Sequence, residues 1–259
     1  MEKGKENSFI CLFFAIVFCF AAIEAKAELV SWYRFEENAD DSAGSNHGTV
    51  YGDLGWTEGK VGDALQFDGV GDYVDLGNDA SLKPLLSVSL CAWIKLSALD
   101  VVQQIIHLNA AQTEPYAGTN LAVMPDNYIK ISYGDGMGTG PSHRRSKYGT
   151  SILQSDTWYH IVGVIRGPED MDIYIDGIDD EGTYSGTGGP LAYTTAPATV
   201  GSITEVHSNL YGIIDEAAIW NHALSSDEVT DIYINGVPEP ATIALFAVGS
   251  IILLRKRHS

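Results

Sequence analysis

The chain has 259 residues, 19% of them charged, and a formal net charge of −19. Residues 1–27 are neutral overall and residues 237–259 carry +2, so the stretch from 28 to 236 carries −21. A surface this acidic repels nucleic acid and anionic lipid, which excludes partners held through a phosphate backbone. The stretch of about 210 residues between the two ends suits one all-β domain rather than two.

The first 27 residues have the parts of a secretory signal peptide. Two lysines lie among the first seven residues, an apolar run covers 8–23, and Ala25 and Ala27 form an A-x-A cleavage site. The sequence therefore predicts export through the Sec pathway, with the mature chain beginning near residue 28. The alternative is an N-terminal membrane anchor, which the polar Glu24 and the small-residue exit disfavour.

The number of cysteines limits how the exported domain can be stabilised. Of the three cysteines, only Cys91 lies beyond the signal segment, so an internal disulfide is excluded there and stability must come from packing or a bound ion. Cys91 lies in the apolar run 88–94, which favours a buried thiol over a reactive one.

Short β-rich runs separated by Gly, Asp, Asn and Pro recur along the chain, and helical periodicity is nearly absent. This pattern predicts a two-sheet antiparallel sandwich. The predicted strands cover residues 29–36, 64–67, 73–76, 87–96, 103–108, 120–124, 128–133, 158–166, 172–175, 198–202 and 211–220.

Turns, loops and one helix complete the prediction. Hairpin turns are expected at 68–69, 125–127 and 176–177. Residues 134–151 and 181–197 are rich in Gly, Ser and Thr and are predicted to be loops. A single helix is expected at 225–234, capped by Ser225 or Ser226 and ended by Gly236.

Seven short motifs follow one another in a characteristic order. They are residues 32–36 (WYRFE), 41–48 (DSAGSNHG), 64–69 (ALQFDG), 73–76 (YVDL), 158–162 (WYHIV), 173–177 (IYIDG) and 214–225 (IDEAAIWNHALS). Together they resemble the LamG-like jelly roll of the laminin G, pentraxin and concanavalin A-like lectin/glucanase superfamily, over roughly residues 29–236. The resemblance implies an all-β, two-sheet antiparallel jelly-roll sandwich with one short C-terminal helix.

The resemblance also implies a structural Ca²⁺ where the first strand meets the last. By matching position, Glu36, Asp41 and Asp215 would supply carboxylates and the 46–48 turn would supply carbonyls, the oxygen ligands that Ca²⁺ prefers. The alternative is that Asp41 forms a turn and Asp215 caps a strand end.

Related glucanases place two acidic residues two apart on one strand face, as nucleophile and acid/base. Asp170, Asp172 and Asp176 share such a face here, but they are aspartates where that pattern has glutamates, and Asp176 also fits a hairpin turn. A divergent glycoside hydrolase is therefore kept as an alternative, and the expectation is that the domain has no catalytic residues.

The C-terminal end has Val237, Pro238, Glu239 and Pro240, then an apolar run over 241–254 and three basic residues at 255–257. This arrangement resembles a PEP-CTERM sorting signal. The apolar run would extend ~21 Å as a helix, a short transmembrane segment with its basic end in the cytoplasm. The resemblance implies an exosortase-type processing enzyme, a transient inner-membrane anchor, and delivery to the cell surface or extracellular matrix.

These observations predict three units, namely a signal peptide (1–27), a jelly-roll domain (28–236) and a sorting segment (237–259). The favoured function is an exported, non-catalytic recognition or adhesion module that binds extracellular polysaccharide or glycoprotein. A structural matrix protein without a ligand is a further alternative. Arg144 and Arg145 could meet acidic sugars, and aromatic candidates for stacking on sugars are Tyr116, Tyr133, Tyr148, Tyr184 and Tyr193.

Overall fold

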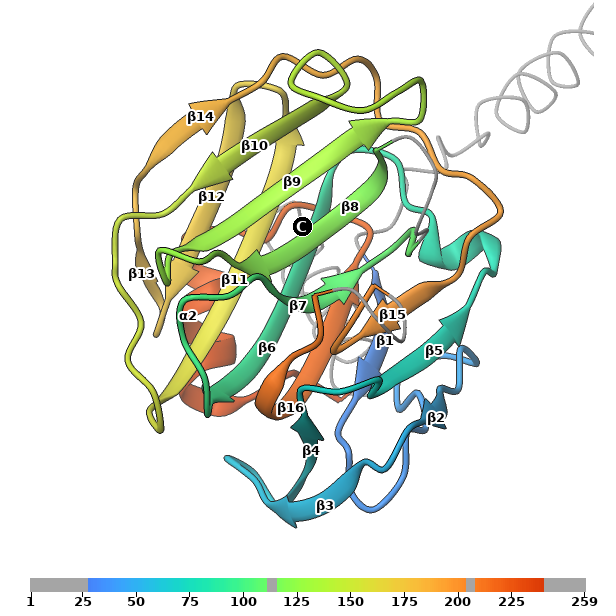
Figure 1. Cartoon of the computed structure of the whole chain (residues 1–259), viewed down its shortest axis with the longest axis vertical. Helices are drawn as coiled ribbons and strands as arrows, with labels where there is room; N and C mark the ends of the chain where they lie inside the picture. Colours follow the sequence, from blue (N-terminus) through green and yellow to red (C-terminus); the bar gives the residue numbers. More distant parts are fainter. Residues whose placement is uncertain (1–27, 111–115, 204–207, 240–259) are drawn as a thin grey trace, which may run out of the picture.

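The computed structural model describes residues 28–110, 116–203 and 208–239. Within these residues, two antiparallel sheets pack face to face (Figure 1), which confirms the predicted jelly-roll sandwich. Sheet A has the order β13 (Ile178–Asp179), β12 (Asp170–Ile175), β11 (Trp158–Gly167), β6 (Val88–Leu96), β16 (Tyr211–Trp220), β4 (Asp63–Asp68) and β3 (Gly55–Glu58), with β1 (Leu29–Tyr33) also paired to β16. Sheet B has the order β14 (Thr183–Ser185), β10 (Arg144–Tyr148), β9 (Ile129–Asp135), β8 (Ala117–Val123), β7 (Gln103–His107), β15 (Ala198–Val200), β5 (Tyr73–Gly77) and β2 (Thr49–Tyr51). A 3-10 turn, η1 (Ala80–Leu82), precedes β6.

The main core lies between the two sheets, because every second residue of a strand faces the opposite sheet. Sheet A contributes Phe67 and Ile94, and sheet B contributes Leu121 and Ile131, all fully buried. The two sheets approach each other closely at Gly201, which has a φ of +87° and lies against the ring of Phe67. Any side chain at this position would clash with the ring, so the glycine is required there.

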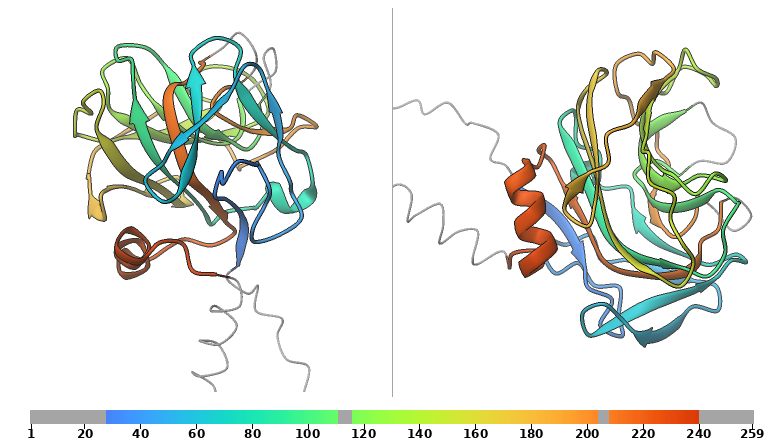
Figure 2. Two further views of the ribbon diagram at one scale, coloured as in Figure 1. Left: turned by 90° about the horizontal axis from the view of Figure 1, so that it is seen from below. Right: turned by 90° about the vertical axis from the view of Figure 1, so that its left-hand side faces the viewer.

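The outer face of sheet A carries a second apolar cluster under the helix α2 (Ser226–Asn235). Val229 and Ile232 of the helix pack on Trp32, Cys91 and Val162 of the sheet. Figure 2 shows the helix against this sheet, on the side away from sheet B. Burial raises the pKa of the Cys91 thiol, as expected for an unreactive core cysteine.

The helix ends agree with the sequence. The Ser225 side chain accepts from the Glu228 amide, while the Glu228 carboxylate accepts from the Ser225 amide, which makes a complete capping box. Gly236 ends the helix with a φ of 83°. Two predicted hairpins, at 125–127 and 176–177, are also confirmed by the pairing of β8 with β9 and of β12 with β13.

Three predictions about local structure are wrong. The turn at 68–69 is not a hairpin, because β4 belongs to sheet A and β5 to sheet B, so the chain crosses between the layers there. The stretches 134–151 and 181–197, predicted as loops, contain β10 and β14, whose polar sequences lack the apolar alternation that indicates a strand. The short strands β2 and β3 were missed for the same reason.

The predicted targeting segments fall mostly outside the described residues. The signal peptide with Ala25 and Ala27, and the tail from Pro240 onward, are not described. The start of the tail is ordered on the domain, since Val237 packs in the second apolar cluster and the Glu239 carboxylate lies 3.8 Å from the Arg34 guanidinium. No helix in the described ranges is long and apolar enough to cross a membrane.

Candidate functional site

The predicted metal-ligating residues separate into two places. The last strand, β16, pairs with β4 through residues 211–214 and with β1 through residues 217–220, so Asp215 and Glu216 lie between these pairings. The ladder to β6 is interrupted at the same point, and Glu216 adopts a φ of 51°, as in a β-bulge. The bulge places two adjacent carboxylates where the first and last strands meet.

Asp215 and Glu36 both hold the loop that joins β3 to β4. Asp215 Oδ2 accepts from the amides of Lys60 at 2.8 Å and Val61 at 2.9 Å, and Glu36 Oε2 accepts from the amide of Asp63 at 3.1 Å. Glu36 and Asp215, two of the three predicted metal ligands, therefore both contact this loop. Asp215 Oδ1 is buried and has no hydrogen-bond partner among the described residues.

Glu216 is the neighbouring carboxylate that the sequence analysis did not select. Its Oε2 accepts from Trp32 Nε1 at 2.7 Å, whereas its Oε1 is buried without a hydrogen bond in the described part of the chain. Burial raises the pKa of Asp215 to about 6 and of Glu216 to about 7. Two carboxylate oxygens without a hydrogen bond suit a cation, and Arg34 Nε already lies 3.9 Å from Glu216 Oε1. No group of three or more His, Cys, Asp or Glu side chains placed to hold a metal occurs in the described ranges.

Asp41 lies apart from this bulge and is fully engaged. Its Oδ1 accepts from the amides of Trp32, Ala43 and Gly44, and its Oδ2 accepts from the amide of Asn46, all at 2.9 to 3.0 Å. Asp41 therefore closes the turn after β1 and offers no unused oxygen to a metal ion.

The aspartates of the glycosidase alternative lie on and after β12. Arg166 Nη1 is 3.0 Å from Asp170 and 2.6 Å from Asp172, and Lys147 Nζ is 3.4 Å from Asp172. Asp176, in the hairpin turn after β12, accepts through Oδ1 from the amide of His160 in β11, at 2.8 Å. Each of the three carboxylates is thus paired with a cation or an amide of this chain.

The outer face of sheet B carries a continuous row of polar side chains. Ile129, Ile131 and Tyr133 of β9 point into the core, so Lys130 and Ser132 between them point outward. From Ser132, each inter-strand partner in turn is also polar, so that every strand of the sheet contributes one polar residue to a single row. This set, called the polar row below, is Ser185, Ser146, Ser132, Asn120, His107, Thr199, Asp75 and Thr49.

The centre of the polar row is enclosed although it faces away from the core. Ser146 is 2% exposed, Ser132 and Thr199 are 1% exposed, and His107 is 8% exposed. A solvated sheet face would leave such short side chains open to water. The centre of the polar row is therefore shielded from bulk water, and Ser132 donates to Asn120 Oδ1 at 2.5 Å within it.

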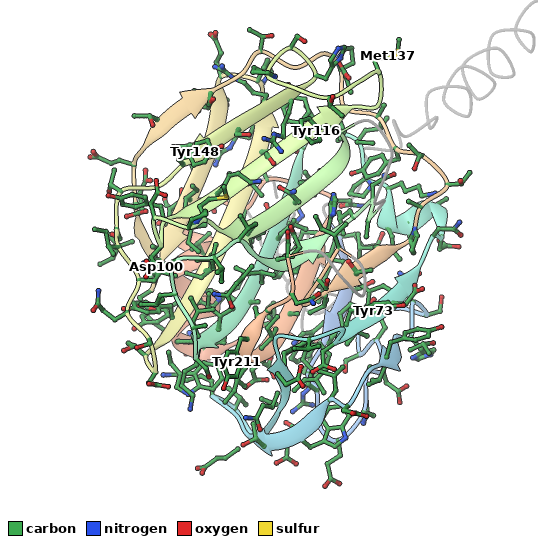
Figure 3. All side chains as sticks on the ribbon, in the orientation of Figure 1. Tyr73, Asp100, Tyr116, Met137, Tyr148 and Tyr211 are labelled. Atoms are coloured by element: carbon green, nitrogen blue, oxygen red, sulfur yellow. The ribbon has the colours of Figure 1, made fainter. Side chains whose placement is uncertain are left out.

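Small and aromatic residues flank the polar row. Gly118, Gly134 and Ala122 occupy outward positions of β8 and β9, which keeps the floor low there. Tyr148 is the partner of Lys130, two residues before Ser132 in β9, and the Arg144 guanidinium lies 4.1 Å from the centroid of the Tyr116 ring. Figure 3 shows Tyr116 and Tyr148 over the front sheet, which is sheet B.

The other aromatic candidates have structural roles. Tyr133 is buried in the core, and the Tyr193 hydroxyl donates to the Pro84 carbonyl at 2.8 Å. Tyr184 accepts from the Met171 amide and lies under Arg145 at 4.6 Å. Of the five predicted aromatic residues, Tyr116 and Tyr148 remain candidates for contact with a ligand.

Two titratable groups on this face have unusual environments. Burial, followed by the charge of Lys130, lowers the pKa of His107 to about 3, and His107 Nδ1 has no partner among the described residues. Burial, followed by repulsion from Arg144, lowers the pKa of Lys130 to about 7. The face thus combines hydroxyl, amide, imidazole and cationic groups in a largely dry setting.

Comparisons with solved structures give the same fold. Domain 4 of AbnA, a GH43 extracellular arabinanase from Geobacillus stearothermophilus, in complex with arabinotriose, has 20% identity and a TM-score of 0.60, covering 80% of this chain and 98% of that one. The binding domain of Paraclostridial Mosquitocidal Protein 1 has 14% identity and a TM-score of 0.61, covering 80% and 52%. The receptor binding domain of botulinum neurotoxin D has 17% identity and a TM-score of 0.58, also covering 80% and 52%.

The chain spans about half the length of these two toxin domains. At such identities the likeness concerns the fold alone. No curated protein matches the sequence. The model of the family described as the concanavalin A-like lectin/glucanases superfamily matches residues 68–230. This match covers more than half of the sequence, and the chain belongs to the concanavalin A-like lectin/glucanase superfamily.

Proposed function

We propose that this protein is an exported, non-catalytic module that binds polysaccharide, or the glycans of a glycoprotein, along the polar row of sheet B. The single observation that carries the proposal is that every strand of the sheet contributes a polar residue to one row, and that its centre is buried. Seven inter-strand steps of ~4.8 Å give a floor ~34 Å long, which suits an extended chain ligand.

The chemistry of the polar row matches that of a sugar. Hydroxyl, amide and imidazole groups such as Ser132, Asn120 and His107 can both donate to and accept from sugar hydroxyls. Because Ser132 and Asn120 are hydrogen-bonded to each other, their side chains are held in position before a ligand arrives. Tyr148 and Tyr116 at the flanks offer aromatic faces, which a binding site for an amphipathic ligand requires.

The solved neighbours support a binding role through their fold. One of them is an extracellular domain in complex with arabinotriose, and others are binding domains of toxins. The same fold is also used by glucanases, so a glycoside hydrolase using Asp170, Asp172 and Asp176 is the alternative, and a matrix protein without a ligand is the second.

Export and sorting form part of the proposal. The signal segment with Ala25 and Ala27 supports Sec export, and Val237 to Pro240, followed by the apolar and basic tail, supports processing by an exosortase-type enzyme. The protein would then reach the cell surface or extracellular matrix, after a transient stay of its tail in the inner membrane. Detection of only the unprocessed chain in the cytosol would contradict this part.

A structural Ca²⁺ is proposed at the β16 bulge. Asp215 and Glu216 fit this ion, since each has a buried oxygen without a hydrogen bond and a raised pKa, and Glu36 approaches the same loop. Asp41 does not fit, because four amides use its oxygens. The ion would neutralise the two carboxylates and join the first and last strands to the loop between β3 and β4.

A glycan panel probed with the purified mature protein tests the function. Selective binding is expected, and Asn120→Ala should weaken it roughly tenfold, because a hydrogen-bonding group in a sheltered site is lost. Asn221→Ala, an exposed change in the turn after β16 of sheet A, is the matched control and should leave binding unchanged.

Three outcomes would contradict the proposal. Failure to bind any glycan would favour the matrix protein, and equal binding by the Asn120→Ala variant would place the site elsewhere. Hydrolysis of a β-glucan that is lost in Asp172→Asn would establish the glycosidase.

A further inference from the structure

Lys130 is a buried cation without a counter-charge. It points outward from the centre of β9, beside Ser132 of the polar row, and it is only 5% exposed. No hydrogen bond or ion pair involves its ammonium group in the described part of the chain. A buried charge is costly unless it is paired, and the low pKa of about 7 reflects that cost.

The other basic residues of the domain are engaged with this chain. Arg34, Lys147 and Arg166 form ion pairs, Lys83 and Arg145 donate to carbonyls, and Lys60 and Lys95 lie over tryptophan rings. Arg144 stacks on Tyr116 but has no carboxylate partner among the described residues. In a domain with a net charge of −21, Lys130 and Arg144 both lie on the outer face of sheet B, and neither has a carboxylate partner in the described ranges.

The sheet register places these two cations on either side of Ser132. Lys130 lies two residues before Ser132 in β9, and Arg144 is the partner of Gly134, two residues after it. Four residues of a strand extend ~14 Å, so two long side chains approaching from opposite ends can meet over Ser132 and its partner Asn120. Stacking on Tyr116 fixes the guanidinium of Arg144 in advance.

Unpaired polar atoms lie beside the same spot. His107, the partner of Asn120, has an Nδ1 atom without a hydrogen bond, and Asn109 Nδ2 is likewise unpaired within the described ranges. A Cβ on Gly118 would be 2.4 Å from Asn109 Cβ, so a glycine is needed for Asn109 to lie this close to β8.

We propose that Lys130 and Arg144 together bind the carboxylate of an acidic sugar residue within a polysaccharide lying along the polar row. The inference rests on the proposed glycan-binding function and names the class of sugar. A carboxylate accepts charge-assisted hydrogen bonds from an ammonium and a guanidinium, and Ser132, Asn120 and His107 are placed to bind the ring hydroxyls beside it. The net charge of −21 opposes a densely charged polyanion, so scattered uronic acids on a largely neutral chain are the preferred ligand.

Calorimetry with matched pairs of ligands tests this specificity. The probes are trimers of galacturonic, glucuronic and mannuronic acid, each compared with its neutral methyl ester, titrated into the mature protein at constant ionic strength. At least one acid should bind about tenfold more tightly than its ester, because the ester cannot accept charge-assisted hydrogen bonds. Equal binding of acid and ester in all three pairs would overturn the inference, as would no binding of any acid.

Variants assign the preference to the two cations. Lys130→Met, which keeps the apolar stem, should lower the affinity for the acid to that for its ester, and Arg144→Gln should reduce the preference for the acid. Lys95→Met, with the same loss of charge on the outer face of sheet A, should keep it. An acid preference that survives both Lys130→Met and Arg144→Gln would overturn the assignment.

The two proposals can fail separately. Binding of neutral glycans without any preference for an acid would refute the role of Lys130 and leave the polar row as a glycan site. Failure of every acidic and neutral glycan to bind would refute both.

Discussion

Replacing Asp41 with alanine should lower the free energy of unfolding by about 3 kcal/mol, because the change removes the acceptor of four backbone amides. The amides of Trp32 and Asn46 belong to buried residues and would stay unsatisfied, at ~1.5 kcal/mol each. Ala43 and Gly44 are half-buried or exposed, so water can replace the carboxylate there at little cost.

Urea-induced unfolding of the mature protein, followed by tryptophan fluorescence, measures this loss, once with Ca²⁺ and once with a chelator. The same loss is expected in both, since Asp41 has no oxygen to spare for an ion. Asp40→Ala, next to it with a side chain that is 70% exposed, is the control and should cost less than about 0.5 kcal/mol. A loss below about 1 kcal/mol for Asp41→Ala, or a loss seen only with Ca²⁺, would refute the reasoning.

Three further changes test other parts of the structure. Gly201→Ala should lower the free energy of unfolding by about 3 kcal/mol or more, because the alanine Cβ would lie 2.1 Å from the Phe67 ring at a positive φ. An unchanged melting temperature in thermal unfolding would contradict this packing. Burial lowers the pKa of His160 to about 4, so between pH 6.5 and pH 4 this residue binds a proton in the unfolded chain but not in the folded one. The free energy of unfolding should therefore fall by up to about 3 kcal/mol as the pH falls through this range. His160→Phe should flatten this dependence in denaturant titrations, and an equally steep profile would assign it to other groups. Chelation should lower the melting temperature of the wild type but not of Asp215→Ala, whereas identical curves with and without chelator would remove the metal proposal.

The fold was predictable because its strongest signals are local. The apolar and β-branched residues of β11 and β16 and the turn residues at 125–127 and 176–177 indicate strands and hairpins without knowledge of their partners. Ser225 and Gly236 likewise mark the helix ends. His160, between Tyr159 and Ile161 of β11, is 1% exposed, and its ring centroid lies 5.1 Å from that of Trp93.

The candidate site was not predictable because it depends on register between distant strands. The alternation in β9 shows that Lys130 and Ser132 face away from the core, but it does not show that they are buried. The β10 strand was interpreted as a loop, because Arg144–Tyr148 contains four polar or charged residues and no apolar alternation. It is held by pairing with β9 and β14, contacts that follow only from the assembled sheet. Asp41 shows the same limit, since its spacing suits both a metal ligand and a turn, and only the four amides around it distinguish them.

The two outer faces of the sandwich explain where binding can occur. Outward residues of sheet A such as Cys91 and Val162 are apolar, so α2 gains free energy by covering them, and changes there should act on stability. On sheet B the corresponding row is polar in every strand, so an amphipathic helix would have to desolvate hydroxyls and amides without replacing their hydrogen bonds. A ligand that carries its own hydroxyls can satisfy those groups as it displaces water. Substitutions on this face should therefore change affinity while leaving the fold intact, which is the separation expected of a binding surface built on a rigid scaffold.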